Sequence, residues 1–254
     1  MKTIEQMTLA EIVSENPSTA RLFEDKHLDF CCKGKRTLEQ ACMDAGLDVS
    51  TTRYEIEELD YMRKQSNDTL NFNTMELDEL ADYIVHKHHT YVKEMMPMIQ
   101  FHVRKVAIKH GESHPEALRI FENFERVVTD LEMHMMKEEN ILFPYIKKLV
   151  EVKNIGFASN TIHEFVKNPI NVMLDEHDQV NLLLVEIRKL SNEFTPPADA
   201  CTTFKLSYAE LKEFEEDLHK HIHLENNLLF PKALQLEDLL VAGFHSQNST
   251  ISMN

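Results

Sequence analysis

One block of sequence occurs twice in this chain, and it constrains the fold more than any other feature. Residues 130–144 read DLEMHMMKEENILFP, and residues 217–231 read DLHKHIHLENNLLFP. Both fit the pattern D-L-x-x-H-x-x-x-E-x-N-[IL]-L-F-P. A histidine and a glutamate four residues apart lie on one face of a helix. The duplication therefore predicts two related halves, each presenting the same pair of side chains.

Long helical segments surround both copies of the block. A capping box at Asn73 and Glu76 opens the first, and Gly111 follows its last turn. No stretch of alternating apolar and polar residues is long enough to predict a strand. The sequence thus predicts an all-α protein built around a four-helix bundle. Its long helices are expected at about 73–111, 113–148, 168–195 and 202–236, with a long connection at 151–167.

Each long segment carries an apolar stripe at intervals of three and four residues, which indicates the inward face of a bundle helix. The first stripe runs through Leu77, Ala81, Ile84, His88, Tyr91 and Met95, and the second through Phe124, Val127, Leu131, His134, Glu138, Ile141 and Tyr145. The third contains Ile170, Met173, His177, Val180, Leu184 and Ile187, and the fourth Leu211, Phe214, Leu218, His221, Glu225 and Leu228. Histidines and glutamates therefore lie where a core should be apolar.

The polar residues of these stripes form a candidate metal site. Isolated buried carboxylates cost many kcal/mol unless they are paired or bound to metal. The alternatives, a solvated polar layer or an apolar stripe assigned to the wrong helix face, are favoured for a lone HxxxE but not for six residues in a duplicated frame. Symmetry predicts two ions, each with two imidazoles, bridged by two carboxylates; such donors suit iron, and ligand type alone leaves manganese and zinc open. The predicted ligands are His88, His134, His177, His221, Glu138 and Glu225.

Three acidic residues lie close to these histidines in the sequence. Asp130 and Asp217 each precede a block histidine by four residues, so they either accept a free imidazole N–H or remain on the helix surface. Glu176 is either a proton relay beside His177 or an exposed residue. The histidines off the stripes are expected to face outwards, among them His86, His89, His219 and His223.

The chain before the bundle has a different organisation. Residues 1–70 contain short helices opened by capping signals such as Thr8 with Glu11. Helices this short are not stable alone, so they are predicted to form a small separate helical domain. The bundle is expected to span 73–240, and a flexible polar tail is expected at 241–254.

An adjacent cysteine pair marks the N-terminal region. Cys31 and Cys32 precede a cluster of basic residues and a helix start near Thr37. Positive charge and a helix N-terminus lower a thiol pKa and favour the thiolate. The pair therefore has either a redox or metal-handover role or a structural one.

Charge and hydropathy exclude several classes of function. The formal net charge is −16. A surface this acidic repels phosphate backbones and anionic lipids, which disfavours nucleic-acid and membrane-surface binding. No charge-free apolar run approaches the roughly 18 residues that a membrane span needs, and the N-terminus lacks the apolar region of a signal peptide. We expect a cytoplasmic protein with neither nucleic-acid nor membrane partners.

The order H…HxxxE…EHD…HxxxE resembles that of hemerythrin-like proteins. More closely, the chain resembles the repair-of-iron-centres di-iron family, often called iron-sulfur cluster repair proteins. The similarity lies in HMMKEENILFP, in the segment 170–178 that contains EHD, in ACTTFK at 200–205 and in HIHLENNLLFP. The segment DFCCKGKRTL at 29–38 resembles the small cysteine-pair domain that precedes the bundle in that family.

This resemblance implies a hemerythrin-like up-down four-helix bundle with a small N-terminal helical domain. It implies the same six ligands, with histidines terminal and Glu138 and Glu225 bridging, around two non-haem iron ions per chain joined by oxo and carboxylate bridges. It also implies a role in repairing, or supplying iron to, iron-sulfur clusters damaged by nitric oxide or oxidative stress. The partners would be damaged iron-sulfur proteins or an assembly scaffold, with a homodimer as a further option. A nitric oxide or peroxide reductase and an oxygen or nitric oxide sensor need the same ligands, but the cysteine domain favours repair.

Overall fold

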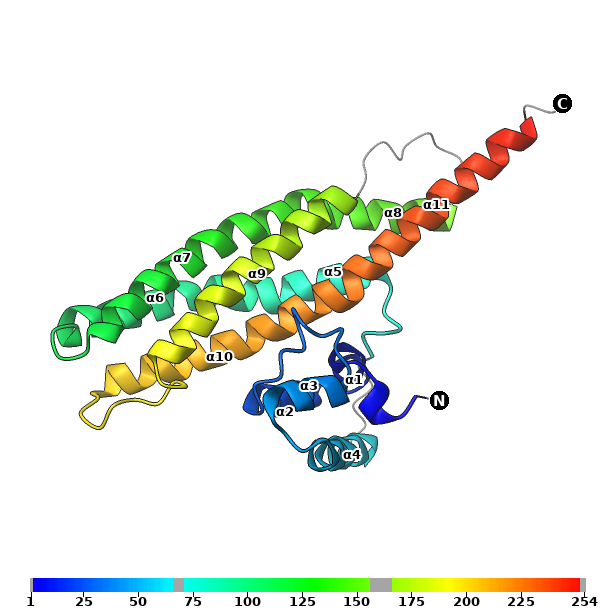
Figure 1. The fold of residues 1–254 in the computed structure, drawn as a ribbon. Helices are drawn as coiled ribbons and strands as arrows, with labels where there is room; N and C mark the ends of the chain where they lie inside the picture. Colours follow the sequence, from blue (N-terminus) through cyan, green and yellow to red (C-terminus); the bar gives the residue numbers. More distant parts are fainter. Residues whose placement is uncertain (1, 66–70, 156–165, 252–254) are drawn as a thin grey trace.

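The computed structural model describes residues 2–65, 71–155 and 166–251 (Figure 1). Over these residues the chain is helical and contains no β-strand, as predicted. The N-terminal helices are η1 (Ile4–Gln6), α1 (Leu9–Glu15), α2 (Thr19–Asp25), α3 (Leu38–Ala45) and α4 (Val49–Gln65). No helix in the described ranges is both long and apolar enough to cross a membrane.

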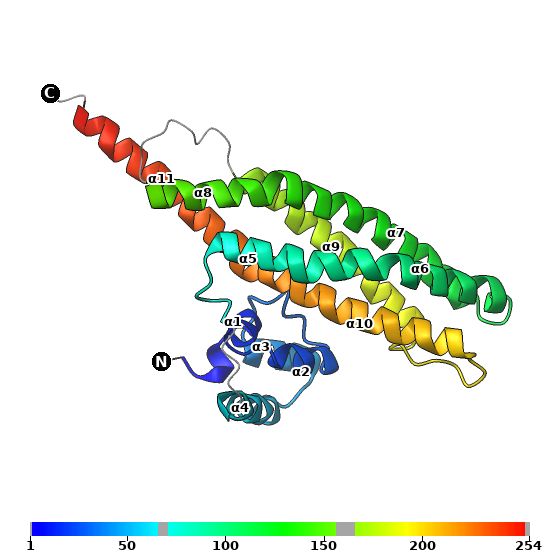
Figure 2. The same cartoon turned by 180° about the vertical axis from the view of Figure 1, so that it is seen from behind.

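Four long helical rods form the bundle, and three of them contain a short π-helical segment. The first rod consists of α5 (Leu77–Tyr83), η2 (Ile84–His89) and α6 (Thr90–His110), and the second of α7 (Pro115–Lys137), η3 (Glu138–Leu142) and α8 (Phe143–Ile155). The third is α9 (Lys167–Leu190), and the fourth consists of α10 (Thr202–Leu224), η4 (Glu225–Leu229) and α11 (Phe230–Ile251). Seen from behind in Figure 2, α6, α7, α9 and α10 lie side by side.

The π segments of the first two rods shift the inward face of those rods by one residue. A π turn contains one residue more than an α turn, so an apolar stripe that is counted with α-helical spacing falls out of register beyond it. In the second rod, the predicted Ile141 is 58% exposed, whereas its neighbour Leu142 is buried. In the first rod, Val92 and Met96 are buried in place of the predicted Tyr91 and Met95, which are only partly buried. The rod without a π segment, α9, buries its whole predicted stripe.

The capping signals of the N-terminal region are confirmed. The Thr8 hydroxyl accepts the Glu11 backbone N–H, and the Glu11 carboxylate accepts the Thr8 N–H in return. Thr37 and Gln40 make the same reciprocal pair at the start of α3, and Gly46 ends that helix in the left-handed conformation with φ 67°. These caps fix short helices that lack the length to be stable alone.

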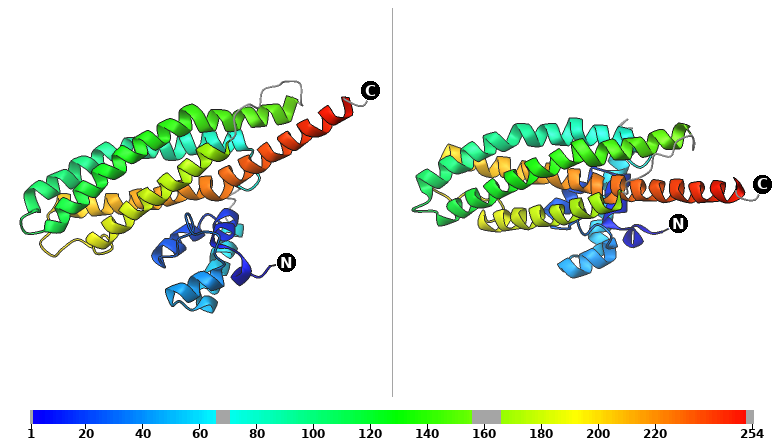
Figure 3. Two further views of the ribbon diagram at one scale, coloured as in Figure 1. Left: turned by 45° about the horizontal axis from the view of Figure 1, so that its top comes forward. Right: turned by 90° about the horizontal axis from the view of Figure 1, so that it is seen from above.

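The N-terminal helices pack against α10, as the two views of Figure 3 show. Phe23 and Phe30 are buried in the same apolar cluster as the bundle residues Phe204 and Phe214. At the edge of this contact, Glu24 accepts hydrogen bonds from His219 of α10 and from Arg188 of α9. The N-terminal region therefore lies against one face of the bundle.

Two predicted segments differ from the structure or fall partly outside the described residues. The helix α11 continues to Ile251 and extends beyond the other rods, so most of the segment predicted as a tail at 241–254 is helical (Figure 3). The predicted connection at 151–167 begins inside α8, which ends at Ile155, and its residues 156–165 lie outside the described residues.

Candidate metal centre

Two groups of buried side chains meet in the middle of the bundle. Both contain Glu138 and Glu225, and in each group the potential ligand atoms lie within 4.8 Å of one another. All the side chains involved are at most 2% exposed. One group consists of His89, Glu138, His221 and Glu225, and the other of His134, Glu138, His177 and Glu225.

Each of the two carboxylates faces both groups. The Oε1 atom of Glu138 lies 3.3 Å from His134 Nε2, and its Oε2 atom lies 3.3 Å from His89 Nε2. The other half repeats this arrangement, with Glu225 Oε1 at 3.0 Å from His221 Nε2 and Glu225 Oε2 at 3.2 Å from His177 Nε2. One oxygen of each glutamate is thus directed at each group, which is the geometry of a bridging carboxylate.

The structure replaces His88 with His89 in the predicted set. The other five predicted residues come together, but His88 belongs to neither group, because its Nδ1 atom bonds Asp217 at 3.0 Å. Ile84 is buried on the inward face, and the π segment Ile84–His89 adds one residue before the next inward position. That residue is His89, which is fully buried and was predicted to face outwards.

Hydrogen bonds around the groups orient three of the imidazoles. The Nδ1–H of His89 donates to Glu139 at 2.7 Å, and that of His177 donates to Asn226 at 2.8 Å. Glu139 follows Glu138 and Asn226 follows Glu225, so they hold the same position in the two copies of the sequence block. His134 Nδ1–H donates to Glu176 at 2.9 Å. An imidazole that donates from Nδ1 presents a lone pair at Nε2, ready for a metal.

The centre consists almost wholly of acceptor atoms, which is the test of whether it fits a metal. Nε2 of His134 and Nε2 of His177 are only 2.9 Å apart, and the corresponding atoms of His89 and His221 are 3.2 Å apart. Both oxygens of Glu138 are buried without a hydrogen-bond partner. Such facing lone pairs and buried carboxylates are costly unless cations lie between them, so the residues fit a pair of metal ions.

Without a metal, protons must supply the missing positive charge. Burial lowers the pKa of His134, but the negative charge of Glu138 and the hydrogen bond with Glu176 outweigh burial and raise this pKa to about 10. Burial raises the pKa of Glu225, but the adjacent imidazoles of His221 and His177 hold that pKa well below its ordinary range. The carboxylates therefore stay ionised, and the site keeps its affinity for cations.

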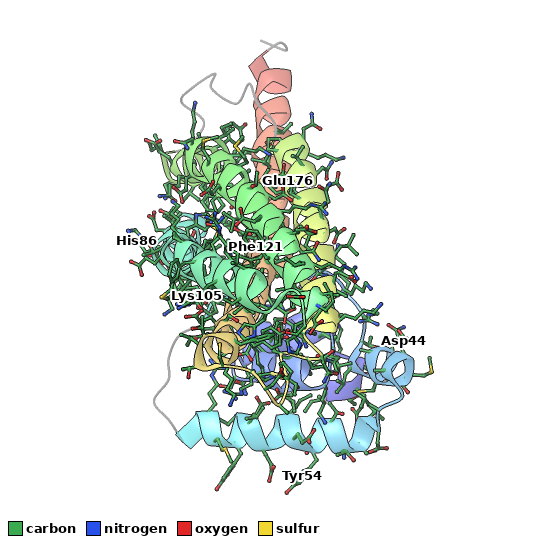
Figure 4. The ribbon with its side chains drawn as sticks, turned by 90° about the vertical axis from the view of Figure 1, so that its left-hand side faces the viewer. Asp44, Tyr54, His86, Lys105, Phe121 and Glu176 are labelled. Atoms are coloured by element: carbon green, nitrogen blue, oxygen red, sulfur yellow. The ribbon has the colours of Figure 1, made fainter. Side chains whose placement is uncertain are left out.

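The three acidic residues predicted to lie beside the ligands differ in whether and how they contact a histidine. Glu176, which lies on α9 (Figure 4), accepts a hydrogen bond from His134 and forms an ion pair with Lys137. The hydrogen bond from His134 is the main cause that lowers the pKa of Glu176 to about 2. Asp217 accepts from His88 rather than from His221. Asp130 is exposed, and no imidazole of the described residues donates to it.

The two groups are not equivalent in their surroundings. Glu176 immediately precedes His177 and supports His134, whereas the residue that precedes His89 is His88. The His88 ring stacks on His221 with a centroid distance of 5.6 Å, and the buried Nδ1 of His221 has no hydrogen-bond partner. The two ligand groups are therefore similar in their ligands but differ in the residues that contact those ligands.

Several of these residues were missed by sequence reasoning. His89, Glu139 and Asn226 were not predicted. His223 is buried and His219 is partly buried, although both were expected to face outwards; His86 is exposed as expected (Figure 4). The sequence contained one weak signal for His89. The spacing from His89 to His134 matches the spacing from His177 to His221 more closely than the spacing from His88 to His134 does. The equivalent positions of Glu139 and Asn226 in the repeat were also visible.

The expected lowering of the thiol pKa is wrong for Cys31. The basic residues after the pair were expected to lower the thiol pKa. Instead, a hydrogen bond with Cys32, burial and the nearby charges of Cys32 and Asp29 raise the pKa of the Cys31 thiol well above its ordinary value. Cys31 is therefore a protonated thiol in the metal-free protein at neutral pH.

Comparisons with known proteins agree with this geometry. Residues 80–233 match the hemerythrin HHE cation binding domain, and residues 5–60 match a domain of unknown function (DUF542). A probable iron-sulfur cluster repair protein from Haemophilus influenzae is 34% identical over 90% of this chain and 97% of its own length. The chain belongs to the family of iron-sulfur cluster repair proteins.

Further relatives in this repair family extend over nearly the whole chain. The iron-sulfur cluster repair protein YtfE of Enterobacter sp. is 37% identical over 89% of this chain and 96% of its own length, and that of Musicola paradisiaca is 35% identical over 91% and 98%. The hemerythrin match contains both candidate groups, from His89 to Glu225. A hemerythrin domain indicates that the bound cation is non-haem iron.

Proposed function

We propose that the bundle holds two iron ions per chain, one in each group, joined by Glu138 and Glu225 and by an oxo bridge. The support is the division of each carboxylate, whose two oxygens are directed at imidazoles of different groups. An N4O2 set leaves coordination positions open on both ions, and the metal pair would supply releasable iron.

We further propose that this protein works in the cytoplasm by repairing, or supplying iron to, iron-sulfur clusters damaged by nitric oxide or oxidative stress. The relatives that cover nearly the whole chain carry the name iron-sulfur cluster repair protein. Its partners would be damaged iron-sulfur proteins or a scaffold on which clusters are assembled, and it would act alone or as a homodimer. The observation that carries this proposal is the buried pair of ligand groups together with the attached cysteine domain.

The ion in the His89 and His221 group is proposed to be the more easily released. Outer hydrogen bonds to imidazole ligands increase metal affinity 10–100-fold, and His221 lacks one. A cavity of about 330 Å³ also opens next to this group and is lined by His88 and Asp217 together with Tyr83. Because His88 both lines the cavity and stacks on His221, the cavity reaches the layer next to the ligands.

A direct test follows iron from this protein into a damaged cluster. The protein is loaded with ⁵⁷Fe and mixed anaerobically with an enzyme whose [4Fe–4S] cluster has been degraded by nitric oxide, and Mössbauer spectra record ⁵⁷Fe in the rebuilt cluster. The His134→Ala variant, which loses a ligand, is the control and should restore little activity. Equal recovery with the variant, or with free ferrous salt at the same concentration, would refute iron supply. Catalytic consumption of nitric oxide by the loaded protein with an electron donor would instead favour the reductase.

A further inference from the structure

A third cluster of potential ligands lies in the loop between α2 and α3. The side chains of Asp29, Cys31 and Cys32 present ligand atoms within 4.8 Å of one another. The Sγ atoms of the cysteines are 3.7 Å apart, and Cys31 Sγ lies 3.4 Å from Asp29 Oδ1. Cys31 is 3% exposed, whereas the other two side chains are partly buried. Two sulfurs and a carboxylate thus converge in a loop whose backbone contacts Asn227 of the bundle.

The backbone of this loop is fixed from two sides. Asp29 Oδ1 accepts the backbone N–H of Cys32 at 2.9 Å and that of Lys33 at 3.2 Å. From the bundle, the Asn227 amide donates to the carbonyl of Cys31 at 3.0 Å and to that of Phe30 at 3.3 Å. The cysteines are therefore held in one arrangement before any ion binds.

The asparagine at this position makes different hydrogen bonds in the two copies of the sequence block. Asn140 occupies the position of Asn227 in the first copy, and its amide donates to the Met136 carbonyl within its own rod. In the second copy, three consecutive residues of η4 serve different parts of the molecule. Glu225 belongs to both ligand groups of the bundle, Asn226 orients His177, and Asn227 holds the cysteine loop. The cysteine loop is thus attached to the turn that shapes the metal centre.

The donor atoms of the loop define the ion that it would accept. Thiolate ligands select zinc, copper(I) and iron over magnesium and calcium. Closed structural zinc sites have four protein ligands, whereas sites that exchange a ligand have three and keep one position open. A cavity of about 310 Å³ borders Asp29 and Cys31, so an ion or a small ligand can approach that open position.

We propose that Asp29, Cys31 and Cys32 form a third, mononuclear and exchangeable site for a thiophilic divalent cation such as Fe²⁺ or Zn²⁺. The site is separate from the two ligand groups of the bundle, and it binds whether or not those groups are filled. Binding converts both thiols to thiolates and releases their two protons to solvent, so no oxidant or reductant takes part. It leaves one coordination position open to the cavity.

Cobalt provides the test, because thiolate-bound Co²⁺ has a charge-transfer band in the near ultraviolet. The full-length protein, with iron in the bundle, is titrated anaerobically with Co²⁺. We expect one additional ion per chain and a thiolate band. Cys31→Ser and Cys32→Ser should each weaken Co²⁺ binding at least about 100-fold, because loss of a residue that only hydrogen-bonds to a metal ligand already lowers metal affinity 10–100-fold. Asp29→Asn keeps an oxygen for the two backbone N–H groups but loses the charge, so it should weaken binding about 10-fold or more.

Two controls separate this site from the others. Cys201 Sγ lies 3.3 Å from His110 Nε2, so Cys201→Ser removes the competing thiol and should leave the band unchanged. His134→Ala should lose bundle iron but keep the cobalt band, which makes failure of the bundle proposal distinguishable from failure of this one.

Three results would overturn the proposal: no thiolate band in the native protein, a band that survives both serine substitutions, or a band lost with Cys201→Ser. Should a serine variant fail to fold, alkylation of the native protein decides the matter without any substitution. Mass spectrometry should show that one equivalent of Zn²⁺ protects Cys31 and Cys32, but not Cys201, from iodoacetamide. Equal alkylation of the pair with and without Zn²⁺ would count against the site.

Discussion

Replacing His89 with alanine should remove about one of two iron ions, whereas replacing its neighbour His88 should remove neither. The two residues are adjacent on η2 and are both buried, so they form a closely matched pair. His89 Nε2 lies 3.2 Å from His221 Nε2 within one ligand group, but His88 Nδ1 bonds Asp217 outside both groups. Counting by the α-helical period assigns the opposite roles.

The size of the effect follows from the contacts that each substitution removes. His89→Ala deletes one of two imidazoles from its group and leaves Glu138 Oε2 without its neighbouring nitrogen. Loss of a residue that only hydrogen-bonds to a metal ligand weakens metal binding 10–100-fold. Loss of the ligand itself should therefore weaken the binding of one ion by at least about 100-fold, or about 2.7 kcal/mol. His88→Ala removes a partly buried hydrogen bond to Asp217, which should cost about 1–3 kcal/mol of unfolding free energy but no ion.

The assay is iron stoichiometry after anaerobic gel filtration, with circular dichroism to verify the helices. We expect about two ions per chain for the native protein and for His88→Ala, and about one for His89→Ala. Loss of iron from the His88 variant together with full retention in the His89 variant would refute the register assigned to the π segment.

Three further predictions concern the metal centre and the contact between the N-terminal helices and the bundle. Glu176→Gln should weaken the affinity of the His134 and His177 group about 10–100-fold by competition with a chromophoric chelator, because a charged acceptor for His134 Nδ1–H becomes neutral; unchanged affinity would contradict the orienting role. Burial raises the pKa of Glu24, but His219 and Arg188 outweigh it and lower this pKa below its ordinary 4.5, so the carboxylate stabilises the fold fully above pH 4.5 and loses this effect as pH falls through the folded-state pKa. Urea titrations should therefore show Glu24→Gln less stable than the native protein at pH 7, with the difference disappearing in acid; a difference independent of pH would exclude the ion pair as its cause. Removal of iron by chelation should lower the unfolding free energy by about 2.7 kcal/mol for each site, if the free iron concentration had been 100 times the Kd of that site. Calorimetry that finds equal stability with and without iron would argue against metal in the core.

The fold and most of the site followed from pattern alone. The duplicated block located His134, Glu138, His221 and Glu225, because two copies of one spacing carry more information than one. The stripe of α9, which has no π segment, was buried as counted, and it located His177.

The errors in helix register have one physical cause. A π segment adds a residue to its turn, and no residue type in the Ile84–His89 segment marks that addition. The inward residue therefore changed from His88 to His89, and Ile141 became exposed within η3. π segments cluster at functional sites, so the periodic rule failed at the centre itself.

Contacts between distant parts of the chain were beyond sequence reasoning for a different reason. His219 is partly buried and lies 2.6 Å from Glu24 of the N-terminal helices, and His223 is buried against Phe30. Nothing in the period of α10 reveals that a second layer covers its outer face. The docking of that layer also carries Asp29 and the cysteine pair to the bundle.

Iron analysis of anaerobically purified protein, combined with Mössbauer spectroscopy, tests the central claim most directly. A centre made from four imidazoles and two shared carboxylates should contain two iron ions per chain with the antiferromagnetic coupling of a bridged pair. A single uncoupled iron, or a folded protein that binds none when iron is supplied, would contradict it.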